Sequence, residues 1–336
     1  MLPQVDVFIP IYGVERFIEK CLQSVLAQDY ENMRVVLIDD ASPDQSMALA
    51  RQVIEKDNPL QHKVEIVSCP INGGLGATRK IAHSMIAGKY TLFLDSDDYW
   101  DNEHLVSEWV AVAEGGGFQV VISNICHEYP LQGKREVDEV QPRSSGKEMA
   151  YAILDGKEGG YVCNKLFLSE KLKQYSQLVK IGRNFWEDVS VTVPLLYYAE
   201  KVGYYPKVTI HYVHHGNTQY TAVTKPEYIG TLEGILKDFE KEFEGTKDQE
   251  LKQAYNDFKM RIFSILAQLP IRYYKAFRKP IFKVEWTLFP HDLRNTIKYF
   301  AYFLTQKRYI AWLTSPLYKL ALTLHHQLYE EKTYKA

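Results

Sequence analysis

The sequence predicts an α/β fold, in which a mostly parallel sheet is flanked by helices and followed by a helical C-terminal region. Over the first hundred residues, short apolar runs rich in β-branched side chains alternate with segments whose apolar residues recur at helical spacing. From about Lys225 onward the spacing is helical. We therefore expect an α/β domain over residues 1–225 and a helical region over residues 226–336.

The composition is that of an ordinary globular protein. Of the 336 residues, 46% are hydrophobic and 24% charged, which excludes a wholly disordered chain. No run of about 18 apolar residues predicts a membrane-spanning helix, and the first residues lack the basic segment of a signal peptide. The four cysteines form no CxxC pair, so we expect buried thiols in a reducing, cytoplasmic compartment. They are Cys21, Cys69, Cys126 and Cys163.

Turn signals separate the expected elements of the first hundred residues. Pro10 and Gly13 end the first apolar run, and Ser42 and Pro43 are expected to cap and start the second helix. Strands that alternate with helices in this way form a parallel sheet with helices on both faces. The expected strands span residues 5–11, 35–38, 64–67 and 90–94, and the expected helices span residues 14–28, 42–56 and 77–87.

The middle of the chain is less regular. Residues 128–147 are polar and predict a solvated loop or a hairpin. The other expected elements are strands over residues 120–123 and 208–213 and helices over residues 149–154 and 189–198.

Acidic clusters follow two of the expected strands. Asp39 and Asp40 end the second strand, and Asp95-Ser96-Asp97-Asp98 follows the fourth. Ligands of parallel α/β sheets bind at the carboxyl ends of the strands. Three neighbouring carboxylates repel one another, and a hard divalent cation such as Mg²⁺ or Mn²⁺ would relieve the repulsion. The alternative is structural, with Asp98 in a polar turn that caps the next helix and Asp39-Asp40 capping the helix near Ser42.

Weaker candidates lie beside these clusters. Pro10 and Tyr12 end the first strand, where the Tyr12 ring either packs on a base or belongs to the core or its rim. The glycine-rich loop over residues 72–76 matches neither the dinucleotide nor the P-loop pattern. Arg79, which follows it, either contacts a nucleotide or is solvated.

A third group of candidates comes late in the chain. Trp186-Glu187-Asp188 places two carboxylates beside an aromatic ring, which suits a general base with a raised pKa. The alternative is an acidic pair at a helix N-terminus, favoured by the macrodipole. His214 and His215 predict either a metal or phosphate contact or a structural pair.

Together these segments resemble the inverting glycosyltransferases of the family 2 type, which have the GT-A fold. The similarity covers residues 4–220, and its order and spacing are specific. The matching stretches are VDVFIPIYGVERFIEKCLQSVLAQDY, VVLIDDASPDQS, INGGLGATRK, YTLFLDSDDYW, NKLF and FWEDVSV. The resemblance implies a nucleotide-sugar-binding half over residues 1–100 and an acceptor half over residues 101–225. Gly13, Ala41, Pro43 and Cys163 depart from the usual pattern but remove no carboxylate.

The resemblance also implies a role for each matching residue. Asp188 corresponds to the catalytic base, and the metal ligands are Asp97 of the DXD motif and His215. The acceptor side contains Lys165, Trp186 and Glu187. The residues implied to bind the nucleotide sugar are Pro10, Tyr12, Asp39, Asp40, Arg79, Asp95, Ser96 and Asp98.

The implied reaction moves a hexose or N-acetylhexosamine from a UDP-sugar to a hydroxyl of a glycan or lipid-linked acceptor, with inversion and with Mn²⁺ or Mg²⁺. The expected setting is the synthesis of a bacterial surface polysaccharide or glycolipid. The alternative is a non-catalytic GT-A partner or a carbohydrate-binding protein, against which intact Asp97 and Asp188 argue.

The C-terminal region is basic and aromatic. Residues 251–336 hold 15 Lys and Arg but 5 Asp and Glu. This pattern predicts either peripheral binding to the anionic inner face of a membrane, or a helical appendage on the catalytic domain, or a surface for homo-oligomerisation. We do not expect nucleic acid to be the partner. The cations that carry this prediction are Lys275, Arg278, Lys279, Lys283, Arg294, Lys298, Lys307, Arg308 and Lys319.

Overall fold

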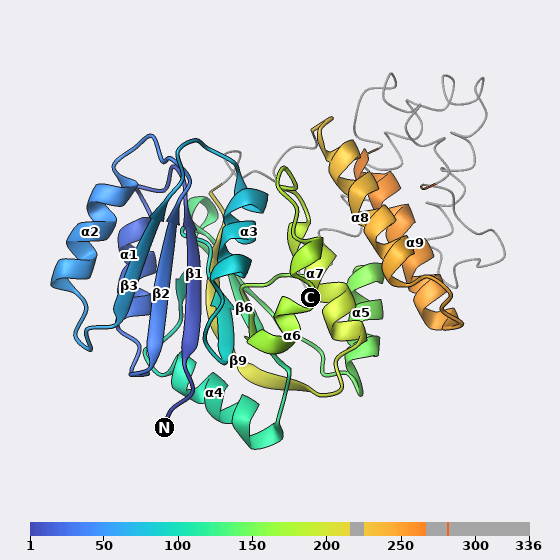
Figure 1. The fold of residues 1–336 in the computed structure, drawn as a ribbon, viewed down its shortest axis with the longest axis horizontal. Helices are drawn as coiled ribbons and strands as arrows, with labels where there is room; N and C mark the ends of the chain where they lie inside the picture. Colours follow the sequence, from blue (N-terminus) through green and yellow to red (C-terminus); the bar gives the residue numbers. More distant parts are fainter. Residues whose placement is uncertain (216–224, 267–280, 282–336) are drawn as a thin grey trace. The chain divides into compact units, whose positions relative to one another are not determined.

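A computed structural model of the chain describes residues 1–215, 225–266 and 281 (Figure 1). The chain divides into two compact units. Unit 1 comprises Met1–Ala150 and Gly160–Gly216, and unit 2 comprises Tyr151–Gly159 and Asn217–Ala336. All the predicted site residues belong to unit 1.

Unit 1 is built on a sheet of nine strands among the described residues, in the order β3-β2-β1-β4-β8-β6-β9-β5 with β7 paired to β6. The strands are β1 (Val5–Ile11), β2 (Met33–Asp39), β3 (Lys63–Ser68), β4 (Tyr90–Phe93), β5 (Tyr99–Trp100), β6 (Val120–Tyr129), β7 (Lys134–Asp138), β8 (Lys165–Leu168) and β9 (Val202–Val213). The first four are parallel, β8 runs against both β4 and β6, and β9 is parallel to β6. The carboxyl ends of β1, β2, β4, β6 and β9 therefore share one edge.

Helices cover both faces of the parallel strands. Alternate residues of β1, such as Val7 and Ile9, pack in one buried cluster with apolar residues of three helices, such as Leu22 and Trp109. On the opposite face, the His83 ring stacks on Phe93 with centroids 5.6 Å apart. The helices of unit 1 are α1 (Ile18–Leu26), α2 (Ser46–Lys56), α3 (Leu75–Met85), α4 (Leu105–Gly116), α6 (Ser169–Lys173) and α7 (Glu187–Tyr197), and α5 (Gly146–Asp155) runs from unit 1 into unit 2.

The expected start of the second helix is wrong. The helix α2 begins at Ser46, and Ser42 does not cap it. The Ser42 hydroxyl instead accepts the Gly13 N–H at 2.9 Å and donates to Asp44 Oδ1 at 2.8 Å. Asp44 Oδ1 also accepts the Ser46 N–H at 3.1 Å, so the aspartate satisfies the first amide of the helix. Ser42 thereby ties the ends of β1 and β2 together.

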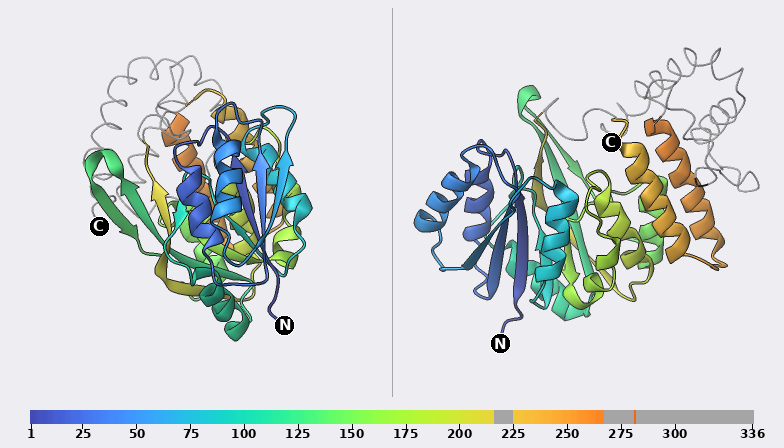
Figure 2. Two further views of the ribbon diagram at one scale, coloured as in Figure 1. Left: turned by 90° about the vertical axis from the view of Figure 1, so that its left-hand side faces the viewer. Right: turned by 45° about the horizontal axis from the view of Figure 1, so that its top comes forward.

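The second half of the sheet is larger than expected. The strands β6 and β9 are longer than the predicted runs, and β8 was not predicted. Polar residues such as Ser123 and Thr209 interrupt the apolar pattern, but their buried hydroxyls bond to each other. The hairpin alternative for residues 128–147 is confirmed, because β7 pairs with the end of β6. This hairpin projects from the rest of unit 1 (Figure 2).

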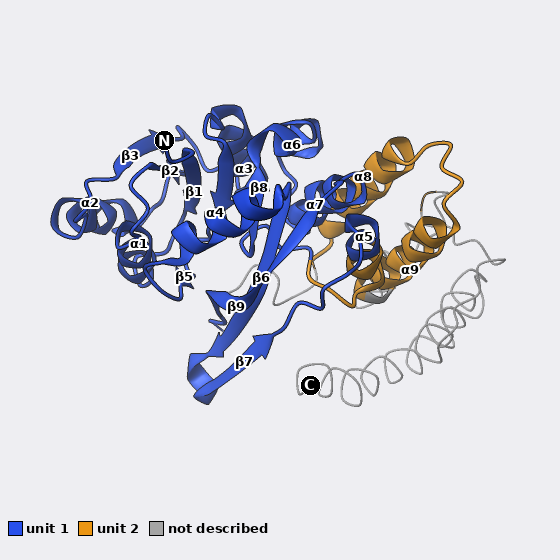
Figure 3. Cartoon of the chain, turned by 90° about the horizontal axis from the view of Figure 1, so that it is seen from below, with its two compact units in different colours: residues 1–150, 160–216 blue, residues 151–159, 217–336 orange. Residues whose placement is uncertain are grey.

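In unit 2, the described residues form the helices α8 (Tyr228–Glu242) and α9 (Gln249–Leu266) in addition to the end of α5 (Figure 3). Phe239 packs on Phe258 with ring centroids 5.7 Å apart, and α8 and α9 confirm the helical spacing predicted from about Lys225 over the residues that they contain. Among the described residues, no helix has the length and apolar character needed to cross a membrane. The nine cations of the basic pattern, from Lys275 to Lys319, lie outside the described residues.

Candidate active site

The carboxyl edge of the sheet gathers the residues predicted to bind nucleotide and metal. Tyr12 follows β1 and is 50% exposed, while Pro10 within β1 lies in register with Ile38 of β2. Asp39 ends β2, and Asp40 follows it. Residues 95–98 follow β4, and His215 follows β9. Segments far apart in the sequence thus meet at one edge.

The carboxylate of Asp40 is bound by its own chain. It is 2% exposed, and its two oxygens accept the N–H groups of Gly73 and Gly74 at 2.8 and 2.7 Å. Asp39 is half-buried and accepts the Ser42 N–H at 2.9 Å. The backbone at Ala41 is left-handed, with φ 56°, a strained conformation that often marks a functional segment. Neither aspartate caps α2, so the helix-capping alternative is wrong.

The glycine-rich loop is in turn fixed to the segment before α7. The Gly76 N–H donates to Asn184 Oδ1 at 2.9 Å. A Cβ atom on Gly74, whose φ is +76°, would lie 2.5 Å from the Asn184 amide. A Cβ on Gly76 would lie 2.5 Å from the backbone oxygens of Arg183 and Lys180. Glycine is therefore required at both positions.

Of the three carboxylates in the turn after β4, that of Asp98 is buried, and those of Asp95 and Asp97 are partly exposed. Asp98 is 2% exposed, and its Oδ1 accepts the Val213 N–H at 2.9 Å. Its Oδ2 is buried without a hydrogen-bond partner among the described residues. The Asp97 side chain is 35% exposed and lies 3.4 Å from His215 Nε2. Asp98 bonds to β9 rather than to α4, so the alternative in which it caps the next helix is wrong.

The environment of this turn disfavours negative charge. Burial, the main cause, raises the pKa of Asp95 to about 6, although Arg79 opposes the shift. Burial and then the charges of Asp97 and Asp95 hold the pKa of Asp98 well above its usual range. Ser96 between them is buried. A cation at this turn would remove the repulsion.

Asp188 lies at the start of α7, on a strained turn. The Trp186 before it has a left-handed backbone with φ 55°, and its ring stacks on Phe185. Asp188 Oδ2 accepts the Val162 N–H at 3.1 Å, and its Oδ1 is buried without a hydrogen-bond partner among the described residues. Burial and the neighbouring Asp188 hold the pKa of Glu187 well above its usual range.

Arg79 joins the two acidic groups. Its guanidinium lies 2.8 Å from Asp95 Oδ1 and 4.0 Å from Glu187 Oε1, and the residue is 4% exposed. Burial would lower the pKa of Arg79, but the charges of Asp95, Asp188 and Glu187 outweigh it and raise the pKa. The charge of Asp188 also contributes to the raised pKa of Asp95. The turn after β4 and the start of α7 therefore share one site.

Lys165 is buried behind this site, at 1% exposure. Its ammonium donates to the Tyr161 carbonyl at 2.6 Å and to Asn164 Oδ1 at 2.8 Å. It therefore supports the segment whose Val162 N–H bonds to Asp188.

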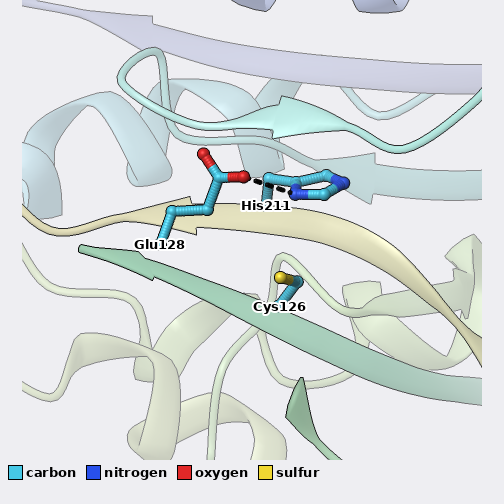
Figure 4. A group of neighbouring side chains, drawn as sticks. All are labelled: Cys126, Glu128 and His211. Atoms are coloured by element: carbon cyan, nitrogen blue, oxygen red, sulfur yellow. Dashed lines mark hydrogen bonds and ion pairs between the residues drawn. The ribbon is translucent and has the colours of Figure 1, made fainter. Parts of the chain in front are cut away.

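Two groups of side chains have the donors to hold a divalent metal. The first comprises Asp97 and His215, whose side chains lie 3.4 Å apart, and Asp98 on the same turn, and carboxylate and imidazole donors are of the kind that suits Mn²⁺ or Mg²⁺. The second comprises Cys126, Glu128 and His211, whose ligand atoms lie within 4.8 Å of one another (Figure 4).

The second group is already satisfied by protein contacts. Glu128 Oε1 accepts the Tyr99 hydroxyl and the Arg135 guanidinium, both at 2.7 Å, and lies 3.1 Å from His211 Nδ1. Burial raises the pKa of Cys126, which keeps it a thiol. These contacts would compete with a metal ion for the second group.

Sequence reasoning did not place Cys163 and Tyr212 near the acidic turn. Cys163 is 2% exposed, and burial together with the charges of Asp95 and Asp98 raises its pKa. Burial and the charge of Asp98 also raise the pKa of Tyr212. Within residues 126–129 and 211–214, Tyr and His recur two residues apart, at His127 and Tyr129 and at Tyr212 and His214. This spacing is the period of a strand, and it is the sequence signal that could have predicted that Tyr212 and the other rings share one face of the sheet.

Comparisons of sequence connect the chain to known proteins. The profile described as Glycosyl transferase family 2 matches residues 6–176, which is half of the chain. An uncharacterized glycosyltransferase of Haemophilus influenzae is 35% identical over 104 residues, 31% of this chain and 40% of that protein. Putative glycosyltransferase EpsH of Bacillus subtilis is 26% identical over 215 residues, 62% of this chain and 60% of that protein. The chain thus spans less than two thirds of these relatives.

A third relative also has a solved structure. Poly(ribitol-phosphate) beta-N-acetylglucosaminyltransferase TarS of Staphylococcus aureus is 37% identical over 103 residues, 30% of this chain and 17% of that protein. Residues 1–349 of S. aureus TarS in complex with UDP-GlcNAc superpose with a TM-score of 0.65 and 19% identity, covering 96% of this chain and 92% of that one. This likeness confirms the expected GT-A fold. The described part of the expected helical C-terminal region is helical, in α8 and α9.

A more distant structure shows the same fold. Mannosyltransferase PcManGT from Pyrobaculum calidifontis, in complex with GDP-Man and Mn²⁺, superposes with a TM-score of 0.54 and 14% identity, covering 98% of this chain and 88% of that one.

Proposed function

Because this chain belongs to glycosyl transferase family 2, we propose that it is an inverting, metal-dependent enzyme whose active site lies at the carboxyl edge of the sheet. Its donor is a UDP-linked hexose or N-acetylhexosamine, and its acceptor is a hydroxyl of a glycan or lipid-linked acceptor in bacterial surface polysaccharide or glycolipid synthesis. One observation carries the proposal: Arg79 lies between Asp95 of the DXD motif and Glu187 beside Asp188.

The donor side is assigned from the strand ends. The exposed Tyr12 ring and Asp39 are proposed to meet the base and ribose, next to Pro10, and Asp40 holds the glycine-rich loop in place. The structures of TarS in complex with UDP-GlcNAc and of PcManGT in complex with GDP-Man and Mn²⁺ support a nucleotide sugar and a divalent cation. Asp97 and His215 would hold the cation with Asp98. A bound Mn²⁺ or Mg²⁺ supplies Lewis-acid stabilisation of the leaving diphosphate.

Asp188 is proposed to act as the general base. It takes the proton of the acceptor hydroxyl while that oxygen bonds to the anomeric carbon and the bond to the diphosphate oxygen breaks. A single displacement of this kind inverts the anomeric carbon. Burial and the neighbouring Asp188 raise the pKa of Glu187, and the Val162 N–H orients the Asp188 carboxylate. Arg79 is a positioning residue that fixes Asp95 relative to Glu187.

The test combines a donor panel with one variant. UDP-glucose, UDP-GlcNAc and GDP-mannose are assayed for hydrolysis and transfer with and without Mn²⁺. Asp188→Asn should keep UDP binding, measured by calorimetry, and lose transfer by roughly 10²- to 10⁴-fold because proton removal is no longer assisted. Asp57→Asn, at the exposed end of α2, is the control. Wild-type turnover in Asp188→Asn refutes the base, and metal-independent UDP binding without hydrolysis of any donor favours a non-catalytic protein.

Four expectations stay predictions. They are the division of the chain at residue 225, the cytoplasmic location, homo-oligomerisation, and the membrane contact of the basic C-terminal region. A membrane contact would bring a lipid-linked acceptor to the active site.

A further inference from the structure

The Phe17 ring packs against the imidazole of His215. The two ring centroids lie 3.9 Å apart, with an interplanar angle of 30°. Phe17 immediately precedes α1 and is half-buried. Ile18 and Leu22 of α1 join the buried apolar cluster under the sheet, whereas the Phe17 ring contacts a residue that lies shortly after β9. A ring from the beginning of the chain therefore contacts a side chain at the far end of unit 1.

His215 in turn contacts the acidic turn after β4. Its Nε2 lies 3.4 Å from Asp97 Oδ2, and its side chain is 13% exposed. The backbone just before it is fixed, since the His214 N–H donates to the Glu128 carbonyl at 2.8 Å. These contacts form a continuous path from Phe17 through the imidazole of His215 to the carboxylate of Asp97.

The segment that carries Phe17 is itself fixed to the turn before α2. The N–H groups of residues 13–15 bond in order to Ser42 Oγ, Ser46 Oγ and Asp44 Oδ2, at 2.9, 2.9 and 3.0 Å. Asp44 Oδ1 accepts both serine hydroxyls. Burial would raise the pKa of Asp44, but the hydrogen bonds from Ser46 and Ser42 lower it to about 2, so the carboxylate stays ionised at neutral pH. The position of Phe17 is therefore set by bonds that do not involve His215.

A contact of this kind can fix the plane of an imidazole. A histidine binds a metal well through one nitrogen when neighbours other than the metal hold its ring in the right orientation. An aromatic neighbour does so through the ring face, which leaves both nitrogens at the ring edge for polar partners. Phe17 has no side-chain group that binds a metal. It can act on a metal only through the ring of His215.

We propose that Phe17 is a positioning residue that holds the imidazole of His215 toward Asp97 and thereby strengthens the binding of a divalent cation at the acidic turn. The inference rests on the proposed function, in which Asp97 and His215 hold that cation. It adds the residue that orients the histidine, and Asp44, which fixes the segment before Phe17.

Titration of Mn²⁺ into the full chain tests this proposal without requiring turnover. Free Mn²⁺ is followed by electron paramagnetic resonance, with and without UDP. Phe17→Ala should weaken Mn²⁺ binding about tenfold, the lower end of the loss that follows when a residue orienting a metal ligand is removed. Phe17→Tyr keeps the ring and should bind Mn²⁺ like the wild type. In a His215→Ala background, Phe17→Ala should have no further effect, because the side chain that it orients is gone.

Phe118→Ala is the matched control. Phe118 is also half-buried, but it lies just before the amino end of β6, at the edge of the sheet opposite the proposed site. Circular dichroism and thermal unfolding show whether each variant is folded. If Phe17→Ala does not fold, Phe17→Leu, which keeps most of the apolar volume but lacks the ring, should give a smaller loss of Mn²⁺ affinity in the same direction.

Three results would overturn the proposal. They are an unchanged Mn²⁺ affinity in the folded Phe17 variant that lacks the ring, an equal loss in Phe118→Ala, and an undiminished effect of Phe17→Ala in the His215→Ala background. If the wild type binds no Mn²⁺, the proposed metal-dependent function fails. The proton NMR resonances of the His215 ring, identified by their absence from His215→Ala, then decide whether Phe17 orients His215. They should move downfield in Phe17→Ala as the ring current is lost, and unmoved resonances would refute the positioning role.

Discussion

The turns after β2 and β4 each present a buried aspartate, but the two carboxylates have different partners. Asp40 has a backbone N–H on each oxygen, from Gly73 and Gly74. Asp98 has one N–H, from Val213, and its second oxygen is buried without a partner among the described residues. The sequence shows both as an acidic residue after an apolar strand. The contrast teaches that two equally buried carboxylates can differ in how far their own chain satisfies them.

The largest effect expected from this contrast is on transfer. Asp98→Asn keeps an oxygen for the Val213 N–H but removes the charge that a cation needs. We expect transfer at saturating Mn²⁺ to fall about 100-fold or more, and the wild-type rise in melting temperature with Mn²⁺ to disappear. Steady-state kinetics and thermal unfolding measure both effects. Asp40→Asn is the matched comparison, and an equal loss of Mn²⁺ stabilisation there would contradict the distinction between the two turns.

The next effect is on stability without metal. An asparagine at position 40 has one acceptor for two N–H groups, so Asp40→Asn should lower the free energy of unfolding by about 1–3 kcal/mol. Asp98→Asn should leave the free energy of unfolding unchanged or raise it, because the substitution removes a buried charge that Asp97 and Asp95 repel. Urea unfolding with EDTA present gives both values. A stabilising Asp40→Asn or a strongly destabilising Asp98→Asn would reverse the contrast.

The smallest effect is a pH dependence that both variants should share. Burial lowers the pKa of His83 from 6.5 to about 3. The unfolded chain therefore binds a proton that the folded chain does not, and stability falls as pH falls below 6.5. From pH 7 to pH 6 this loss is about 0.7 kcal/mol. In His83→Gln, the free energy of unfolding measured with urea should change less between pH 7 and pH 6 than in the wild type. An unchanged pH dependence of this free energy would assign it to another group. The stabilities of Asp40→Asn and Asp98→Asn are therefore best compared above pH 7.

The parallel half of the fold was predictable because its strands are apolar runs bounded by turn residues. The acidic ends of β2 and β4 followed from the same pattern. The pairing of Asp40 with a distant glycine-rich loop could not be predicted, since it depends on backbone N–H groups that carry no side-chain signal. Arg79 was expected to contact a nucleotide or to be solvated. It is instead buried, and its guanidinium lies beside the carboxylates of Asp95 and Glu187, which come from separate segments. The full length of β6 and β9 was missed because their buried polar residues satisfy one another across strands.

The contact of Gly76 with Asn184 has a consequence for protein engineering. Because Gly74 and Gly76 leave no room for a side chain, residues 72–76 and 180–184 cannot change length independently. Chimeras that swap donor specificity among homologues should therefore exchange both segments at once. The tip of the β6–β7 hairpin differs, since Gly133 has open space around it. Affinity tags and loop grafts belong there.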